Sequence, residues 1–308
     1  MAPRTALFDD ASPRPPAARP AGGRGRGPLR DASDAEAPQH QGGPASPGDR
    51  RVPVVGLGIS LLTLEAATEQ VLQWSAEPVG RYVCAANVHM VMEAHDSPAF
   101  RDVVSAAGLV LPDGMPLVFA QRLLGHRGAS RARGVEITER LLVRAALAGV
   151  PVAFYGGTPR TQGLLLEAAR RRFPCLRVAA AISPPFRAAT PEEDERDVRA
   201  IVDSGARILL VGIGCPRQER WMAAHVARLP CVMVGVGQAF DLLAGVVNEA
   251  PRWMHGLGLS WLHRLAQEPR RLFWRYARHN PRFVALLALQ VLRHRLVPRR
   301  PAARLVGM

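Results

Sequence analysis

From residue 51 onward, short apolar runs alternate with longer stretches in which apolar residues recur at helical spacing. The apolar runs cover residues 52–59, 81–86, 109–112, 151–157, 207–214 and 230–237. The helical stretches between them include residues 63–76, 161–172, 217–226 and 239–246. Strands that are apolar on both faces and alternate with helices are typical of a parallel sheet covered on both sides. The pattern therefore predicts a Rossmann-like, doubly wound α/β fold.

The two ends of the chain depart from this alternation. Residues 1–50 are rich in Pro, Gly, Ala, Arg and Asp and lack periodicity, so we expect a disordered segment there. Residues 51–250 form the predicted α/β domain. Residues 251–308 show helical spacing throughout, with aromatic residues and arginines interleaved, and are predicted to form a basic helical appendage.

Charge is concentrated in this appendage. The chain has a net charge of +14, and residues 252–308 contain 12 arginines and a single acid, Glu268. Such a segment can bind either nucleic acid or an anionic lipid surface. No apolar run reaches the ~20 residues that a membrane-spanning helix needs. We therefore expect a protein that lies on a membrane surface, if it meets a membrane at all.

The cysteines and histidines give no metal-binding pattern. The four cysteines have no CxxC spacing, which argues against both a zinc site and a disulfide framework and favours a reducing cytosol. His89 and His95 are six residues apart with no third partner in sequence, so no metal site is expected.

Three of the predicted strands end in glycines that lead into a helix. The segments read YGGTPR, GIGCPRQERW and GVGQAFD, and they match neither the P-loop nor GxGxxG. Each segment alone fits a tight strand-to-helix turn. Together on one sheet edge they predict a nucleotide site, because helix N-termini there offer N–H groups to phosphate oxygens. The glycines concerned are Gly156, Gly157, Gly212, Gly214, Gly235 and Gly237.

Polar side chains stand at the same predicted edge. Asp113 lies between a predicted buried strand and the helix that follows it. It can be interpreted either as a turn residue that caps this helix or as an acid in a cleft. Asn87 follows the predicted strand 81–86 and fits either an N-cap or a cleft residue. Gln218 lies in the predicted first turn of a helix opened by Pro216, and fits either incidental surface or an amide facing the cleft.

Seven collinear motifs between about residues 52 and 276 resemble the WecG/TagA/CpsF family of bacterial glycosyltransferases, glycosyltransferase family 26. They are NVHMVMEA, LPDGMPLV, RARGVEITERL, FYGGTPRT, GIGCPRQERWM, GVGQAFDLLAG and EAPRWMHGLGLSWLHRLAQEPRRLFWRY. The resemblance implies a UDP-sugar-dependent hexosyltransferase. Such an enzyme moves an N-acetylmannosamine-type sugar, a uronic acid or a hexose, with inversion, to a polyprenyl-diphosphate-linked glycan in cell-wall or surface polysaccharide synthesis.

The resemblance also implies roles for single residues. Asp113 corresponds to the family's proposed catalytic base, Gln218 to its active-site glutamine, Asn87 to its cleft asparagine, and Arg131 to a basic residue that meets phosphate. The expected contacts of the UDP-sugar, beyond the glycines above, are Gln238, Asp241, Arg264, Arg271 and Arg275. No metal or other cofactor is implied, so arginines and helix dipoles would neutralise the leaving diphosphate.

Three positions depart from the family's pattern. Ala85 stands where a Thr is frequent, Glu249 where a basic residue is usual, and Ser260 where an acid is common before the Trp. The first departure bears on the contact with the donor sugar. The other two bear on ion pairs within the appendage.

Two other functions stay open at this point. One is a nucleotide-sugar-binding scaffold without transfer activity. The other is an Arg-rich nucleic-acid-binding protein, which leaves the sheet-edge glycines without a role. For the transferase we expect a UDP-sugar donor, a lipid-linked diphosphate-sugar acceptor, an anionic membrane surface that contacts residues 252–308, and no nucleic acid. The expected location is cytoplasmic, peripheral on the inner face of the plasma membrane; the oligomeric state, a homo-oligomer included, is open.

Overall fold

The computed structural model describes residues 50–251, 253–254 and 258–296, with the side chain of Arg271 excepted. Most of the predicted segment 1–50 therefore lies outside the described residues, as do residues 297–308 of the appendage. In chain order the elements are β1 (Arg51–Val54), β2 (Leu57–Ser60), α1 (Leu64–Ser75), β3 (Arg81–Ala86), α2 (Val88–Asp96), α3 (Pro98–Ser105), β4 (Leu109–Pro112), α4 (Met115–Leu123), α5 (Gly134–Ala148), β5 (Val152–Gly156), α6 (Pro159–Arg172), β6 (Val178–Ile182), α7 (Pro191–Asp203), β7 (Ile208–Gly212), α8 (Arg217–His225), β8 (Val232–Gly235), α9 (Ala239–Leu243), α11 (Ser260–Gln267) and α12 (Pro269–Leu296).

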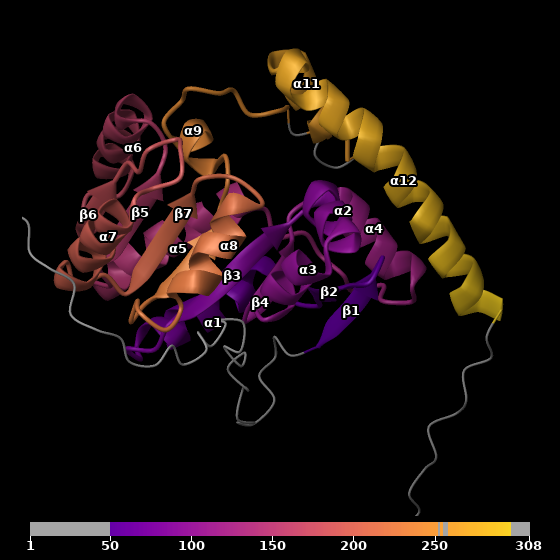
Figure 1. The fold of residues 1–308 in the computed structure, drawn as a ribbon, viewed down its shortest axis with the longest axis horizontal. Helices are drawn as coiled ribbons and strands as arrows, with labels where there is room; N and C mark the ends of the chain where they lie inside the picture. Colours follow the sequence, from indigo (N-terminus) through magenta and orange to yellow (C-terminus); the bar gives the residue numbers. More distant parts are fainter. Residues whose placement is uncertain (1–49, 252, 255–257, 297–308) are drawn as a thin grey trace, which may run out of the picture. The chain divides into compact units, whose positions relative to one another are not determined.

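The centre of the fold is a six-stranded parallel sheet with strand order β4-β3-β8-β7-β5-β6 (Figure 1). All six strands run in the same direction, so their carboxyl ends meet at one edge. The ends of β4, β3 and β8 are neighbours there, and those of β7 and β5 follow. The prediction of a doubly wound α/β fold is confirmed.

Helices bury both faces of this sheet. On β3, Tyr82 and Cys84 point into the core beneath α2, α3, α4 and α8, whereas Val83 points into the core beneath α1, α5, α6 and α9. On β7, Leu209 and Leu210 divide between the two cores in the same way. Burial on both faces explains why these strands read as unbroken apolar runs.

The first apolar run forms a hairpin and takes no part in the parallel sheet. The prediction of a single strand over residues 52–59 is wrong, because β1 and β2 pair antiparallel as a separate two-stranded sheet. The chain reverses at Val55 and Gly56, whose φ angles are 50° and 87°. Positive φ at both central residues gives the tight turn that matches the twist of a hairpin.

The C-terminal helices are predicted correctly as a helical appendage to the sheet, and α12 packs on α2. Phe283 and Leu287 of α12 are buried in the same core as α2 and the β1–β2 hairpin. Gln290 binds the hairpin through both amide atoms: its Oε1 accepts from the Val55 N–H at 2.8 Å, and its Nε2 donates to the Pro53 carbonyl at 2.7 Å. The sheet, α11 and α12 accordingly belong to one compact unit. Among the described helices, none combines the length and apolar character needed to cross a bilayer.

Candidate active site

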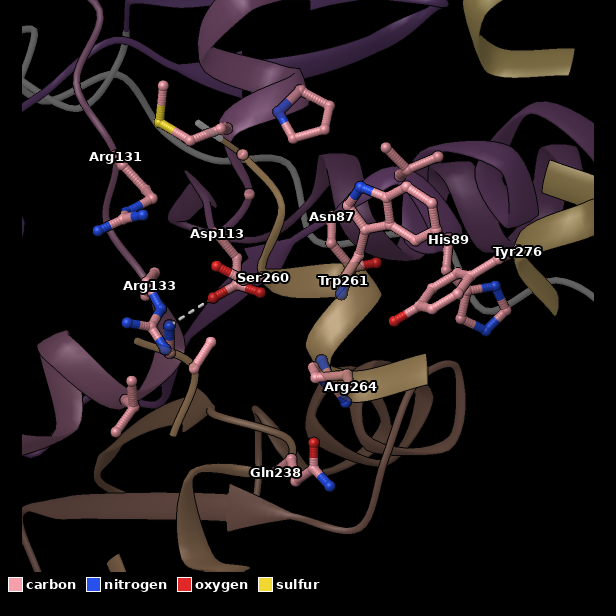
Figure 2. Close-up of a pocket in the computed structure, with 18 of the residues that line it drawn as sticks. Asn87, His89, Asp113, Arg131, Arg133, Gln238, Ser260, Trp261, Arg264 and Tyr276 are labelled. Carbon is pink, nitrogen blue, oxygen red and sulfur yellow. Dashed lines mark hydrogen bonds between the residues drawn. The ribbon is translucent and has the colours of Figure 1, made fainter. Parts of the chain in front are cut away.

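Asp113 lies directly beyond the end of β4 and is held by two backbone contacts. Its own N–H donates to the carbonyl of Ala86 at 2.8 Å, and its carboxylate accepts from the N–H of Gly134 at 2.7 Å (Figure 2). Gly134 is the first residue of α5, whereas α4 is capped by Gly114 without a side-chain bond. The interpretation that Asp113 caps the helix following it in sequence is therefore wrong. The side chain is fixed at the sheet edge by a different helix.

The surroundings of Asp113 favour a proton-accepting role. Burial raises the pKa of this carboxyl above its ordinary value of 3.8, while the bond from Gly134 and the nearby Arg133 and Arg264 lower it by less. A carboxylate whose pKa is moved toward neutral pH is a better general base than a solvated one. The backbone bond leaves the second carboxylate oxygen for a substrate.

If Asp113 is the general base that the family resemblance implies, the kcat/KM for transfer should fall as the pH drops through its raised pKa, because a base must be deprotonated to act. Since burial raises that pKa, the loss sets in at a higher pH than for an exposed aspartate. A kcat/KM profile between about pH 4 and pH 9 measures this limb. A profile that stays flat down to the ordinary aspartate range would contradict the assignment.

Asn87 and Gln218 lie at the N-terminal ends of α2 and α8. Asn87 is the N-cap of α2, and its Oδ1 accepts from the Met90 N–H at 3.2 Å. Gln218 is only 3% exposed, so its interpretation as incidental surface is wrong. Its Oε1 accepts from the Gly214 N–H at 3.3 Å and its Nε2 donates to Glu219 at 2.7 Å. Pro216 is the N-cap of α8 and not a first-turn residue. Asn87 and Gln218 both line the cavity described next.

A polar cavity of about 330 Å³ lies beyond the carboxyl ends of the parallel strands. Its lining includes the glycines predicted at strand ends, namely Gly157, Gly212, Gly214, Gly235 and Gly237, together with Asp241. The positive φ angles of Gly157, Gly214 and Gly237, at 73°, 85° and 56°, suit residues without a side chain. Gly156 is not part of this lining. A Cβ there would meet the Gly212 carbonyl oxygen at 2.5 Å, so its role is the close packing of β5 on β7.

A second cavity of about 490 Å³ adjoins the first and is lined mainly by apolar side chains. The largest of these side chains come from α4, α11 and α12 and include Phe119, Trp261, Tyr276, Phe283 and Leu287. The two cavities have lining residues in common: Asn87, His89, Asp113, Val236, Gln238, Arg264 and Arg275. Both volumes lie within the range of small-molecule sites. The carboxylate of Asp113 therefore stands where a polar and an apolar cavity meet.

Two arginines of the C-terminal helices face this junction. Arg264 comes from α11 and Arg275 from α12, and in each the Nε is buried without a hydrogen-bond partner among the described residues. Figure 2 shows Arg264 and Trp261, both of α11, to the right of Asp113 in this view, and all three line the apolar cavity. A buried guanidinium donor without a partner is costly. A negatively charged ligand at the junction would satisfy both groups.

Comparison with known proteins agrees with this geometry. Residues 52–297 match the model described as glycosyl transferase WecG/TagA/CpsF family. The chain belongs to this family. It is also 30% identical over 224 residues to the N-acetylglucosaminyldiphosphoundecaprenol N-acetyl-beta-D-mannosaminyltransferase of Bacillus spizizenii, with 72% of this chain and 82% of the relative covered. Family membership confirms the resemblance drawn from the motifs and supports a role in cell-wall polysaccharide synthesis.

Three further residues of this WecG/TagA/CpsF chain were predicted to contact substrate, namely Arg131, Gln238 and Arg271. Arg131 lines the apolar cavity, where its Nη2 donates to Glu136 at 2.9 Å. Gln238 is the N-cap of α9 and donates to Glu268 at 3.2 Å. The side chain of Arg271 lies outside the described residues.

Several cleft residues of this glycosyltransferase were not found from the sequence. Arg133 also lines the apolar cavity and forms a 2.6 Å ion pair with Glu249, one of the departures from the family pattern. His89 lines both cavities, and its neighbour is His279 of α12 rather than His95. The partners in these pairs are more than a hundred residues apart, so no spacing rule could join them. The other two residues that depart from the family pattern also line the cavities. Ala85 lines the polar cavity, and Ser260 lines the apolar cavity.

Proposed function

We propose that this chain is an inverting glycosyltransferase that moves a sugar from a UDP-sugar to a polyprenyl-diphosphate-linked sugar. The observation that carries the proposal is the pair of joined cavities with Asp113, Arg264 and Arg275 at their junction. A transferase needs two substrate sites that meet at a base, together with positive charge for the leaving group. A binding scaffold requires only one of the two cavities.

The polar cavity suits the donor. Glycines at strand ends let a nucleotide approach the backbone closely, and the amide of Gln218 and the carboxylate of Asp241 supply polar contacts. The diphosphate would lie toward Arg264 and Arg275, whose buried Nε atoms offer hydrogen bonds. The leaving UDP is then stabilised by fixed charge at the place where negative charge develops.

The apolar cavity suits the acceptor. Its aromatic side chains, Trp261 and Tyr276, can pack against a sugar face, and Phe119 and Leu287 extend the apolar lining. Arg131 and Arg133 add positive charge for the acceptor's diphosphate. The relative from Bacillus spizizenii carries a diphosphoundecaprenol acceptor in its name, which supports an acceptor of this class here.

In the proposed step the Asp113 carboxylate removes the proton from an acceptor hydroxyl. The hydroxyl oxygen forms a bond to the anomeric carbon while the bond from that carbon to the UDP phosphate oxygen breaks on the opposite face. The electron pair of the broken bond leaves with UDP, and Arg264 and Arg275 neutralise its charge. The configuration at the anomeric carbon is inverted. For the donor we propose an N-acetylmannosamine-type sugar, which the name of the relative supports.

The test is a panel of UDP-sugars offered with a polyprenyl-diphosphate N-acetylglucosamine acceptor, with UDP release and the glycolipid product both measured. We expect release that depends on the acceptor, with UDP-N-acetylmannosamine preferred over UDP-glucose and UDP-glucuronate. UDP-sugar binding without acceptor-dependent release would instead support the scaffold. Binding of nucleic acid without UDP release would support the third alternative.

We further propose that the transfer needs no Mg²⁺ or Mn²⁺ at the donor diphosphate. The arginines at the junction supply the positive charge that such an ion would otherwise provide. Adding Mg²⁺ or Mn²⁺ to enzyme freed only of unbound divalent ions should therefore leave kcat within about two-fold of its value without the ion. A stimulation of tenfold or more would contradict this proposal.

Access to a lipid-linked acceptor requires contact with a membrane, and we propose that α12 supplies it. Four exposed apolar residues of α12 are separated by three or four positions, or by sums of these numbers, and therefore share one face of the helix. They are Trp274, Leu289, Leu292 and Leu296. The opposite face carries Phe283 and the other side chains buried against the core. An amphipathic helix rich in arginine can lie in the interface of an anionic leaflet, where each arginine adds about 1 kcal/mol of attraction. We place the protein on the inner face of the plasma membrane.

Replacing Leu289 and Leu292 together by glutamate is expected to reduce sedimentation with anionic vesicles by at least about tenfold, since both the apolar contact and the net attraction are weakened. Leu147→Glu is the matched control, because Leu147 is 81% exposed on α5, away from this face. Wild-type binding should also weaken as salt rises. Equal losses in the two variants, or binding that ignores lipid charge, would argue against α12 as the contact.

A further inference from the structure

A cluster of two histidines and a glutamate lies between α2 and α12. His89 and Glu93 are on successive turns of α2, and His279 comes from α12, 190 residues further along the chain than His89. The Oε1 of Glu93 is 3.7 Å from His89 Nδ1 and 3.7 Å from His279 Nε2. One ligand atom from each of the three residues lies within 4.8 Å of the other two. The imidazole ring centroids are 5.1 Å apart and tilted by 48°.

The three side chains face one another without hydrogen bonding. At 3.7 Å the nitrogen–oxygen separations are too long for a hydrogen bond. The Nδ1 of His89, which faces Glu93, is buried and has no hydrogen-bond partner among the described residues, whereas His279 faces Glu93 with its Nε2. Buried polar atoms without partners are uncommon and indicate a group that the protein atoms do not supply. An atom at the centre of the cluster would give all three residues a partner.

The separations suit a first-row divalent ion better than a water molecule. With metal–ligand bonds of about 2.0–2.1 Å, tetrahedral zinc places its ligand atoms about 3.4 Å apart. Small rotations of the side chains, which move their ligand atoms by a few tenths of an ångström, bring the two 3.7 Å separations to this value. Two imidazoles and one carboxylate are a frequent zinc ligand set with a fourth position left open. Both histidines line the apolar cavity.

The charges near the cluster select among metal ions. Glu93 is the acid of the cluster and Asp96 lies one turn further along α2, while Arg275, Arg278 and Arg282 of α12 are cationic neighbours. The surrounding positive charge opposes the binding of any cation, so an ion held by charge alone, such as Mg²⁺, gains least from this site. Ions with a strong preference for imidazole, such as Zn²⁺ or Co²⁺, are favoured.

We propose that His89, Glu93 and His279 form a zinc-type metal site that cross-links α2 to α12. Both helices contribute to the catalytic junction, since Asn87 caps α2 and Arg275 lies on α12 one turn before His279. A metal bound here fixes the position of α12 and holds Arg275 at the junction. His89 lines both cavities, so under the proposed function this site would adjoin the substrates without replacing the arginines in the transfer step.

The test uses the full-length chain, freed of any histidine tag and stripped of metal, titrated with Co²⁺ and then displaced with Zn²⁺. We expect one Co²⁺ per chain with the visible absorption of a tetrahedral site. His89→Gln and His279→Gln should each weaken binding by more than about 100-fold, beyond the loss typical of an outer partner. His95→Gln is the matched control, because His95 lies on the same helix outside the cluster and should bind like wild type.

Hydrogen exchange provides a second measurement that does not depend on transfer activity. Zn²⁺ should slow amide exchange in peptides of α12 in the wild-type chain and in His95→Gln, and have no effect in His279→Gln. If His279→Gln fails to fold by circular dichroism, Glu93→Gln provides the same comparison. The proposal is overturned by the lack of saturable one-to-one binding up to about 100 μM Co²⁺, or by binding that both cluster variants retain.

Discussion

Asp113→Asn is expected to lower kcat by at least about 10²-fold, and up to about 10⁴-fold, while UDP binds as it does to the wild-type chain. The amide keeps the shape of the carboxylate and an oxygen that can accept the bond from the Gly134 N–H. The fold of the sheet edge should therefore be retained. An amide cannot take up the acceptor's proton, so the loss should appear in kcat and not in the KM for the donor.

The measurement is steady-state UDP release alongside UDP affinity by calorimetry. Asp203→Asn, an exposed aspartate at the end of α7, serves as the matched control and should keep wild-type kcat. A turnover above about a tenth of wild type in Asp113→Asn would place the base elsewhere, because general base catalysis contributes more than that.

Arg264→Gln and Arg275→Gln are each expected to lower kcat by about 10²–10³-fold, the usual cost of removing one donor that stabilises developing charge. Both side chains line both cavities, and both hold a buried Nε without a partner among the described residues. Arg264→Gln has a second expected effect. Because Arg264 lowers the pKa of Asp113, its loss should move the acid limb of the kcat/KM profile to higher pH.

Arg270→Gln is the control for these variants, since Arg270 is exposed at the start of α12. It should leave both kcat and the pH profile unchanged. If Arg264→Gln and Arg275→Gln raise the KM for the donor without changing kcat, the arginines bind the ground state and the leaving group is stabilised by other groups.

The sequence predicts β3, β4, β5, β7 and β8 because burial leaves an apolar run in each, whereas the edge strand β6, whose residues are only half-buried, was not predicted. The prediction of one strand over residues 52–59 was wrong for a physical reason. Val55 and Gly56 differ little from their neighbours in polarity, so the hairpin turn between β1 and β2 leaves no break in the hydrophobic pattern. Turn geometry at this point depends on backbone angles that a β-branched residue rarely adopts. A pattern of apolar positions does not contain that information.

The candidate site could be predicted only where its residues follow strand ends. Asp113, Asn87 and Gln218 each come within a few residues of a strand, and the parallel sheet brings them to one edge. The pairing of Arg133 with Glu249 and the meeting of His89 with His279 depend on how α11 and α12 return over the sheet. Such contacts are set by tertiary packing, which local spacing does not encode.

The anchoring of α12 on the N-terminal hairpin has a consequence for biosynthesis. Gln290 bonds to the turn of the β1–β2 hairpin, and Phe283 and Leu287 fill the core beside α2, yet these are among the last described residues to leave the ribosome. Domains fold as synthesis proceeds, at about 5–20 residues per second, so the apolar surface that receives α12 stays uncovered until α12 has been synthesised. A nascent chain can assemble its sheet early. The proposed junction gains Arg264 and Arg275 only after α11 and the first turns of α12 have been synthesised, and it is fixed only when the end of α12 packs on the hairpin.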